Sequence, residues 1–364
     1  MLDVPRVWEL GSAITEPTST HELTILKSID EFDAGVWNEL VARAPEGTVF
    51  HHAEWVAAIE SAFEYEPYHI VIRKDGNLIG LLPQFEMDLP KVPLRQLRSV
   101  YPGFGGPVIG TDRRAVLSAM MQATRDMCGG RRVLHEIRGC NPELLRYQDH
   151  LYQAGYRPGR YKARFVLDVA RPYEEILEGM SRSRRRGIRR GRDHDYELVE
   201  ESLNPRVIDR LHPVHVAHME DVQGEPFPRT FFDSLTAMDD RLLVLSLYMD
   251  GEYAGSFVEL LDDARSTVHG FLAAVLPSYY EYHASELMYD AAMRWAHEHG
   301  YRTYDFGGAA GDFENGIFQF KQGFGGRLAP NFYWERGFGP LWPAVRMARS
   351  LYIRRRDRGP GSGS

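Results

Sequence analysis

The sequence predicts a mixed α/β fold made of two similar domains. At 364 residues, the chain is long enough for two domains of ordinary size, each with its own core. Each half shows the same order of patterns: helix, β-hairpin, strand, helix and strand. The hairpins are indicated by Asp-Gly pairs between apolar runs, at Asp75-Gly76 and Asp250-Gly251, because these residue types accept the positive φ angles of tight hairpin turns.

The two halves share no residue-level repeat, so the expectation of two tandem units rests on this common order of elements. We expect a flexible N-terminal tail at 1–22, a first domain at 23–168 and a second domain at 169–328, packed around a shared cleft. A C-terminal segment at 329–358 and a flexible end at 359–364 complete the predicted organisation.

In the first half, runs rich in β-branched and aromatic residues predict strands, and apolar residues at helical spacing predict helices. The segment Val100–Gly110 is rich in Gly and Pro, and predicts a loop that leads into a strand end. The predicted strands are 22–28, 68–73, 78–86, 133–137 and 163–169, and the predicted helices are 32–44, 53–63, 113–127 and 142–154.

In the second half, the clearest helix is 285–299, which carries an apolar stripe and ends at Gly300. A first helix at 173–191 is very basic, and a second follows at 204–220. The predicted strands are 242–249, 253–261, 267–273 and 301–306.

The C-terminal segment ends in a predicted helix with apolar residues at Leu341, Trp342 and Val345 and many arginines between 346 and 358. One interpretation is a last helix that packs its apolar face back on the first domain, with arginines favoured near its C-terminal end by the helix dipole. The other is peripheral contact of this basic helix with an anionic membrane surface or with tRNA.

Composition excludes some classes of protein. The formal net charge is −8, so the surface as a whole does not favour polyanions, and any basic patch is local. Cys128 and Cys140 are the only cysteines and lack metal-type spacing, which favours reduced thiols in the cytosol. No apolar run reaches the roughly 18 residues of a membrane span, and no secretory signal is visible, so we expect a cytoplasmic protein.

The most informative stretch is 304–326, where a short aromatic strand is followed by Gly307-Gly308 and a short helix that Asn315 caps. Helical spacing places Lys321 in an apolar stripe, where its ammonium needs an anion or loses its proton. A structural ion pair with Asp305, or a packed stem with its head in water, would also satisfy Lys321. The chain has only five lysines among 43 basic residues, which hints at a need for a compact charge here. The apolar members of the stripe are Ile317, Phe320 and Phe324.

The basic helix is the second candidate site. So many like charges in a few turns lower helix stability unless anions neutralise them. Arg185, Arg186 and Arg189 could bind phosphate on a substrate or on tRNA, or could meet an acidic surface within the protein. Trp55 and Tyr101 could stack on a sugar or a base, or could be core residues.

The loop before the helix at 285–299 holds further candidates. His283 could act as a general acid or base, and Tyr279 and Tyr280 could bind substrate, with loop packing as the alternative for all three. A series at His212, His215 and His218 lacks a carboxylate partner, so we interpret these as residues of a helix face and expect no metal site.

Five motifs together resemble the FemAB-like branch of the GNAT acyltransferase superfamily: FHHAEW (50–55), YPGFGGPVIG (101–110), SRSRRRGIRRGRD (181–193), YDFGG (304–308) and FKQGFGG (320–326). The resemblance covers roughly residues 23–350 and implies two GNAT-like units in one chain. It also implies that Phe320 and Lys321 match the Phe-Lys pair at the reaction centre of Fem-type aminoacyltransferases. The lysine there stabilises the tetrahedral intermediate or holds a phosphate, and the Arg-rich helix lies on the sugar-nucleotide or tRNA side.

The chain departs from the superfamily at 273–286, where acetyl-CoA users carry a Gly-rich turn that holds the pyrophosphate. No glycine occurs there, which argues against a tight amide cradle. We therefore expect no permanently bound cofactor, and either acyl-CoA or aminoacyl-tRNA as the donor substrate.

The expected function is transfer of an acyl or aminoacyl group to an amine of a sugar-linked, peptide or other cell-envelope acceptor. No nucleophile elbow is present, which favours direct attack by the amine without an acyl-enzyme. The expected catalytic residues are Lys321, Asp305 and His283. The alternatives are an acetyl-CoA-dependent N-acetyltransferase of a small molecule, and a non-catalytic double GNAT protein that binds RNA or an anionic surface.

Overall fold

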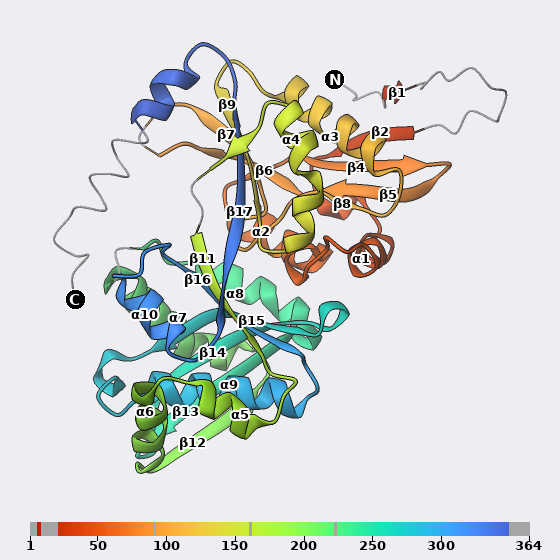
Figure 1. The fold of residues 1–364 in the computed structure, drawn as a ribbon. Coiled ribbons are helices and arrows are strands. Elements are labelled where there is room, and N and C mark those ends of the chain that lie inside the picture. Colours follow the sequence, from red (N-terminus) through yellow and green to blue (C-terminus); the bar gives the residue numbers. More distant parts are fainter. Residues whose placement is uncertain (1–5, 9–20, 91, 160–161, 222–223, 349–364) are drawn as a thin grey trace. The chain divides into compact units, whose positions relative to one another are not determined.

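The structure is a computed structural model that describes residues 6–8, 21–90, 92–159, 162–221 and 224–348 (Figure 1). The chain divides into two compact units. In the described residues, unit 1 comprises the chain up to 159 together with 331–348, and unit 2 comprises 162–330. Strand 162–168, which the sequence analysis places at the end of the first domain, pairs within unit 2.

One sheet of unit 1 is antiparallel throughout, in the order β1-β2-β4-β5-β8. The β4–β5 hairpin turns at Asp75 and Gly76, whose φ angles are +51° and +81°, which confirms the predicted turn. Helix α3 packs Val116 and Met120 against this sheet. The elements are β1 (Arg6–Trp8), β2 (His21–Leu26), β4 (His69–Lys74), β5 (Asn77–Leu82), β8 (Val108–Ile109), α1 (Ala34–Arg43), α2 (Ala53–Ala62) and α3 (Arg113–Met127).

The other strands of unit 1 follow the order β3-β6-β7-β9-β17, and β10 also pairs with β17. The β7–β9 pair is parallel, and the residues Phe332–Gly337 of β17 run antiparallel to β9. The elements are β3 (Glu66–Pro67), β6 (Gln84–Asp88), β7 (Arg95–Ser99), β9 (Arg132–Gly139), β10 (Arg157–Pro158), β17 (Arg327–Gly337) and α4 (Gln148–Gln153).

After β17, a helix begins at Trp342 and continues to the last described residue, 348. Trp342 and Val345 pack against a small cluster of Leu89, Val133 and Leu134 in unit 1. The predicted contact with a membrane or tRNA depends on the C-terminal arginines. Most of these, from 349 onward, lie outside the described residues.

Unit 2 is built on one sheet in the order β12-β13-β14-β15-β16-β11. Only the β15–β16 pair is parallel. The β13–β14 hairpin turns at Asp250 and Gly251, with φ angles of +52° and +79°, as predicted. The strands are β11 (Lys162–Asp168), β12 (Tyr196–Glu201), β13 (Leu242–Met249), β14 (Glu252–Asp262), β15 (Thr267–Val275) and β16 (Thr303–Ala309).

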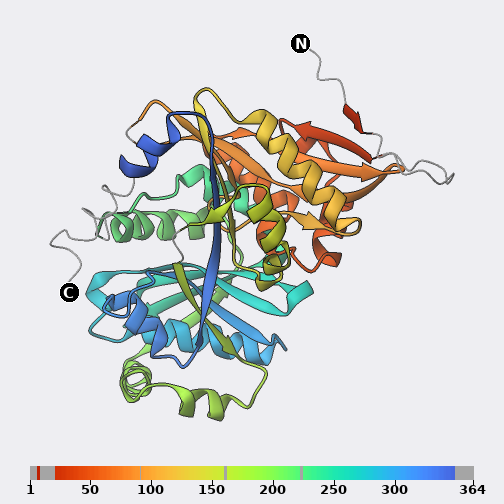
Figure 2. The ribbon, with the colours of Figure 1, turned by 45° about the horizontal axis from the view of Figure 1, so that its top comes forward.

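Helices cover both faces of the unit 2 sheet (Figure 2). One face packs on α9 through a core that includes Leu287, Met288 and Ala292, and the other carries α7 and α8. The predicted helix at 173–191 is two helices, because Ser181 has extended backbone angles and caps a new helix through the backbone N–H of Arg184. The helices are α5 (Tyr173–Gly179), α6 (Arg182–Arg192), α7 (Pro205–Asp221), α8 (Arg229–Leu235), α9 (Ala284–Glu298) and α10 (Gly316–Gln322).

Candidate functional site

A cavity of about 760 Å³ lies in unit 2 where β15 and β16 separate. The two parallel strands pair only from Thr267–His269 to Thr303–Asp305, and beyond this point both contribute residues to the cavity wall. Helices α6, α7, α9 and α10, strand β14, Phe227 before α8 and Tyr280 before α9 supply the rest of the lining. Its volume is within the roughly 300–1,000 Å³ typical of ligand sites.

The predicted stripe of α10 forms part of the wall of this cavity. Ile317, Phe320 and Lys321 line the cavity, while Phe318 from another face of α10 is buried against Phe165. Asn315 caps the helix by accepting from the backbone N–H of Phe318, as predicted. The stripe is therefore divided: Ile317, Phe320 and Lys321 face the cavity, whereas Phe324 is completely buried in the core.

The ammonium group of Lys321 is held by the end of β16. Its Nζ donates to the carbonyl oxygens of Phe306 at 2.6 Å and Gly308 at 3.0 Å. Burial lowers the pKa of Lys321 to about 8, although the carboxylates of Asp305 and Glu259 act in the opposite direction. Because an ammonium has three N–H donors and two are used here, one remains for a substrate oxygen.

Glu259 of β14 is a buried carboxyl group in the cavity wall. It is 1% exposed, and the Tyr304 hydroxyl donates to its Oε1 at 2.9 Å. Its Oε2 has no hydrogen-bond partner among the described residues. Burial raises the pKa of Glu259 to about 8, against the lowering effects of the Tyr304 hydrogen bond and the Lys321 charge. A buried carboxyl with a pKa near neutral and one unpaired oxygen is typical of a general base.

Two glycines keep the space between these groups open. A Cβ on Gly270 would lie 3.4 Å from Glu259 Oε2, and a Cβ on Gly307 would lie 3.9 Å from Lys321 Nζ. Gly307 has a φ of +72°, and its Cβ would also lie 2.6 Å from the carbonyl oxygen of Gly270. The carboxyl and the amine therefore flank the point where β15 and β16 separate.

Asp305 is not part of the cavity lining. Its Oδ2 pairs with Arg164 and with His269 Nδ1 at 3.2 Å, and its Oδ1 accepts from the backbone N–H of Gly307 at 3.0 Å. Burial alone would raise the pKa of Asp305, but Arg164 and His269 outweigh it and hold that pKa below its usual range. Its role in the structure is to fix the end of β16, and a direct catalytic role stays a prediction.

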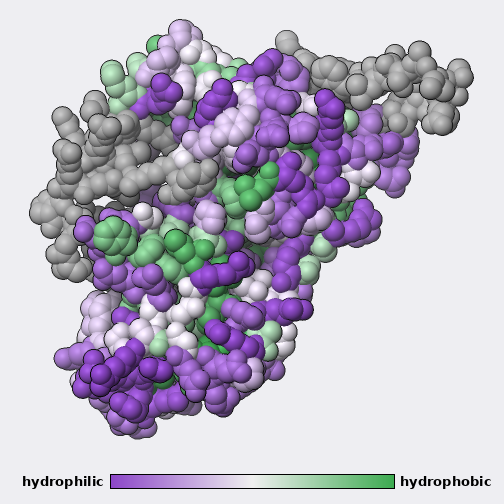
Figure 3. All heavy atoms as spheres, in the orientation of Figure 1, coloured by the Kyte–Doolittle hydropathy of each residue, from purple (hydrophilic) through white to green (hydrophobic). Residues whose placement is uncertain are grey.

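The arginine of α6 that lines the cavity is Arg184, which was not among the predicted arginines. Arg184 donates to Glu286 Oε1 at 2.5 Å and lies 4.1 Å over the Phe320 ring. The predicted Arg185, Arg186 and Arg189 are exposed and outside the lining. Figure 3 shows the α6 end of unit 2 as strongly hydrophilic. These three arginines are thus available to ligands that approach from solution.

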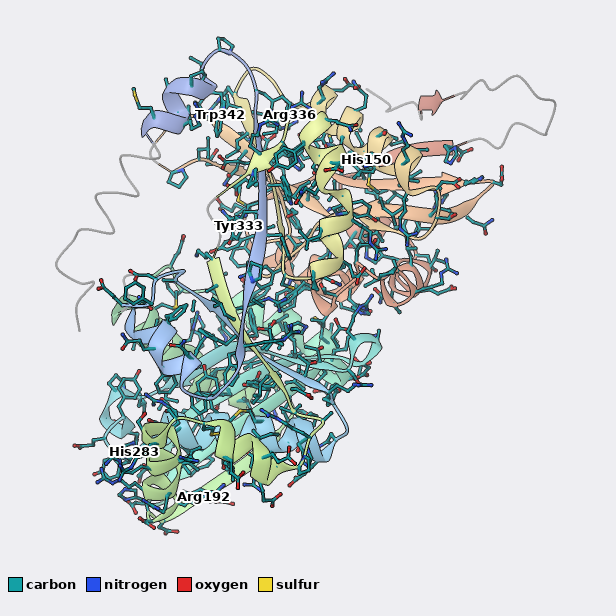
Figure 4. All side chains as sticks on the ribbon, viewed as in Figure 1. His150, Arg192, His283, Tyr333, Arg336 and Trp342 are labelled. Atoms are coloured by element: carbon teal, nitrogen blue, oxygen red, sulfur yellow. The ribbon has the colours of Figure 1, made fainter. Side chains whose placement is uncertain are left out.

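The loop before α9 contributes one of its three predicted residues. Tyr280 lines the cavity and is 43% exposed, whereas Tyr279 and His283 are not in the lining. His283 precedes α9 with a φ of +60°, and its Nδ1 lies 3.7 Å from Glu286 Oε1. Figure 4 places it beside α6, on the same side of unit 2 as Arg192.

Trp55 and Tyr101 belong to unit 1. Trp55 is completely buried, and its Nε1 donates to the carbonyl oxygen of Pro102 at 3.1 Å. Tyr101 is partly buried, with the guanidinium of Arg98 4.0 Å from its ring centroid. The structure thus gives Trp55 a core environment and leaves Tyr101 with a cation–π contact.

The sequence analysis did not select Glu259, Arg184 and Glu286 for the site, nor His215 and His218, which also line the cavity. A carboxylate within the apolar run of β14 was a usable signal, since a buried charge without a partner is costly. The histidines gave a weaker signal, because helical spacing shows which residues share a face but not what that face contacts.

The described residues contain neither a candidate metal cluster nor a candidate membrane-spanning helix. No group of three or more His, Cys, Asp or Glu side chains in this part of the chain is arranged to hold a metal ion. No helix within the described ranges has the length and apolar character needed to span a membrane.

The family comparison identifies the class of this site. Residues 180–322 match the family model described as Acetyltransferase (GNAT) domain. This segment contains every residue of the cavity lining, including Lys321 and Glu259. The match assigns residues 180–322 of unit 2 to the GNAT acetyltransferase domain, which is an acyltransferase domain. A comparison with curated proteins gave no match.

Several solved structures share the fold over most of both chains. FemX has a TM-score of 0.68 at 13% identity, with coverage of 86% of this chain and 98% of FemX. The C-terminal domain (DUF2156) of a putative lysylphosphatidylglycerol synthetase from Agrobacterium fabrum has a TM-score of 0.60 at 14% identity, with coverage of 90% and 97%. A tandem GNAT protein from the clavulanic acid biosynthesis pathway has a TM-score of 0.53 at 15% identity, with coverage of 88% and 99%. These matches confirm the predicted tandem arrangement of two GNAT-like units.

Replacing Glu259 by Gln should stabilise the protein more as the pH rises. The pKa of Glu259 in the folded protein, about 8, exceeds its ordinary value of 4.5. The free energy of unfolding of the wild-type protein therefore falls as the pH rises from 4.5 through 8. Gln does not titrate, so we expect a gain of up to about 5 kcal/mol at pH 9 and of at most about 1 kcal/mol at pH 5. Thermal unfolding at pH 5, 7 and 9 measures this difference.

The matched control is Glu281→Gln, which removes an exposed carboxyl in the loop before α9. It should leave the unfolding temperature nearly unchanged at every pH. A Glu259→Gln effect that stays constant from pH 5 to pH 9 would contradict the raised pKa.

Proposed function

We propose that the protein is a FemAB-like N-acyltransferase that transfers an acyl or aminoacyl group to an amine of a sugar-linked, peptide or other cell-envelope acceptor. The carrying observation is the pair formed by the Glu259 carboxyl and the Lys321 amine, which flank the separation of β15 and β16 in one cavity. Likeness in fold to FemX and to a putative lysylphosphatidylglycerol synthetase supports an envelope acceptor. A cytoplasmic location is part of this proposal.

The proposed reaction is direct attack of the amine on the acyl carbonyl carbon. Glu259 accepts the proton that the amine loses as the C–N bond forms, and the unpaired Oε2 is the atom that receives it. The free N–H of Lys321 stabilises the negative oxygen of the tetrahedral intermediate. Collapse of the intermediate breaks the bond to the leaving thiol or hydroxyl, which takes up a proton from one of these two groups.

The donor is an acyl-CoA or an aminoacyl-tRNA in this proposal. Acyl-CoA is favoured by the match to a GNAT acetyltransferase domain. A tightly held pyrophosphate is disfavoured because the first turn of α9 carries Glu286, an acid paired with Arg184, near the helix N-terminus where an anion would otherwise bind. The exposed arginines of α6 offer an alternative contact for phosphate groups of the donor or the acceptor.

The rate should depend on pH as a narrow bell with its maximum near pH 8. Activity rises as Glu259 loses its proton and falls as Lys321 loses its own, and both pKa values are about 8. The two groups interact, so the two limbs describe the pair rather than either residue. Measuring kcat/KM from pH 6 to pH 10 with two acceptor amines of different pKa separates these limbs from titration of the substrate.

Single substitutions show which residue produces the acid limb and which the alkaline limb of the pH profile. Lys321→Ala should lower kcat by about 10²–10³ and remove the alkaline limb, by analogy with loss of one oxyanion donor. Glu259→Gln should lower kcat by about 10²–10⁴ and remove the acid limb. Lys27→Ala in unit 1 is the control and should keep the wild-type profile. Full turnover by a folded Lys321→Ala variant would refute the assignment.

Gly270→Ala tests whether the space beside Glu259 is used. The added methyl would lie 3.4 Å from Glu259 Oε2 and 3.2 Å from the carbonyl oxygen of Asp305, so the backbone shifts only slightly while the space is filled. We expect kcat/KM to fall at least about tenfold, with a change in unfolding temperature similar to that of Gly179→Ala, a glycine outside the cavity. Unchanged kinetics would show that substrate does not occupy this space.

A further inference from the structure

One part of the cavity wall, formed by β15, α7 and the segment 224–228, is rich in aromatic side chains. Strand β15 has a β-bulge or irregularity here, because Val258 pairs with Leu272 and Glu259 with Gly270, so that the register shifts at Phe271. Such a bulge redirects a side chain. The Phe271 ring stacks on Phe227 with a centroid distance of 5.7 Å and an interplanar angle of 1°.

Helix α7 adds His215 to this wall as an uncharged ring. The backbone N–H of Phe227 donates to His215 Nε2 at 2.9 Å, which places the remaining proton on Nδ1. Burial lowers the pKa of His215 to about 4, so the imidazole is neutral at physiological pH. Its ring stacks on Phe227 with a centroid distance of 5.3 Å. Met219 and His218 complete the contribution of α7 to the lining.

The charges of the cavity lie on other elements. Arg184 of α6 is paired with Glu286 of α9, and Lys321 and Glu259 mark the reaction centre. Leu272 and Val275 of β15 add further apolar surface. An acetyl group would leave most of the 760 Å³ unfilled. Unfilled apolar surface contributes to binding only when an apolar ligand group covers it.

We propose that the wall built by α7, the segment 224–228 and the bulge of β15 makes this cavity a site for a substrate with an extended apolar chain or ring next to its reacting group. The inference rests on the proposed acyl transfer and names the class of its substrate. The apolar group belongs either to the acyl donor or to the acceptor amine, and the two arms of the experiment distinguish these sources.

The experiment measures binding without turnover. The full chain is titrated by calorimetry with acyl-CoAs from acetyl to decanoyl, and separately with linear amines from ethylamine to decylamine. In one of the two series, affinity should rise about fourfold per added methylene until the cavity is filled. The series that shows the rise identifies the source of the chain. No dependence on length in either series would overturn the proposal.

Two variants tie the effect to this wall. Met219→Trp narrows the cavity at α7, so affinity should stop rising at a shorter chain length than in the wild-type protein. Affinity for the shortest ligand of the series should stay within about twofold. Phe271→Ala enlarges the cavity and should move the optimum to longer chains. Met347→Trp, at a side chain of unit 1 that is 65% exposed, is the control for an added indole. Equal profiles for all three variants would also overturn the proposal.

The outcomes separate this inference from the proposed function. If long chains bind and no acyl group is transferred to any amine, the proposed function fails and the ligand class stands. If transfer occurs with acetyl donors and short amines alone, with no gain from longer ones, the transferase stands and the inference fails.

Discussion

The site depends on the separation of β15 and β16. While the two parallel strands are paired, their backbone groups are satisfied by each other; once they part, the carbonyl oxygens of Phe306 and Gly308 need a donor. Lys321 supplies it, and in doing so its amine is fixed at the floor of a cavity. The same separation exposes Glu259 on the neighbouring strand to the cavity. One local break in strand pairing therefore positions both ionisable groups.

The pKa shifts of Glu259 and Lys321 arise mainly from burial and not from a direct ion pair between them. The Glu259–Lys321 interaction shifts each pKa, yet no ion pair within 4.0 Å joins them in the described residues. A tight ion pair would have kept the carboxyl ionised and the amine protonated far from neutral pH. Because two glycines keep the groups apart, both have pKa values of about 8, close to neutral pH, which suits proton transfer.

Much of the fold was predictable because it depends on local chemistry. The Asp-Gly turns, the Asn315 cap and the stripe of α9 are each determined within a few residues. The break at Ser181 was missed, since a run of arginines on both sides of a serine does not show where one helix ends. Helical spacing placed Lys321 in the cavity wall, whereas Glu259 was missed because the acid within the apolar run of β14 was not used as a signal for burial. Asp305 shows the converse, since its partners Arg164 and His269 come from distant strands.

The bulge at Phe271 makes the length of β15 as important as its composition. Side chains alternate between the faces of a sheet, so loss of one residue here would restore regular pairing with β14 and send the ring to the opposite face. A single codon deletion would then remove the aromatic wall while every other residue of the strand stayed the same. If the wall holds an apolar substrate group as proposed, a one-residue difference in this strand would be enough to change the size of the substrate that the cavity accepts.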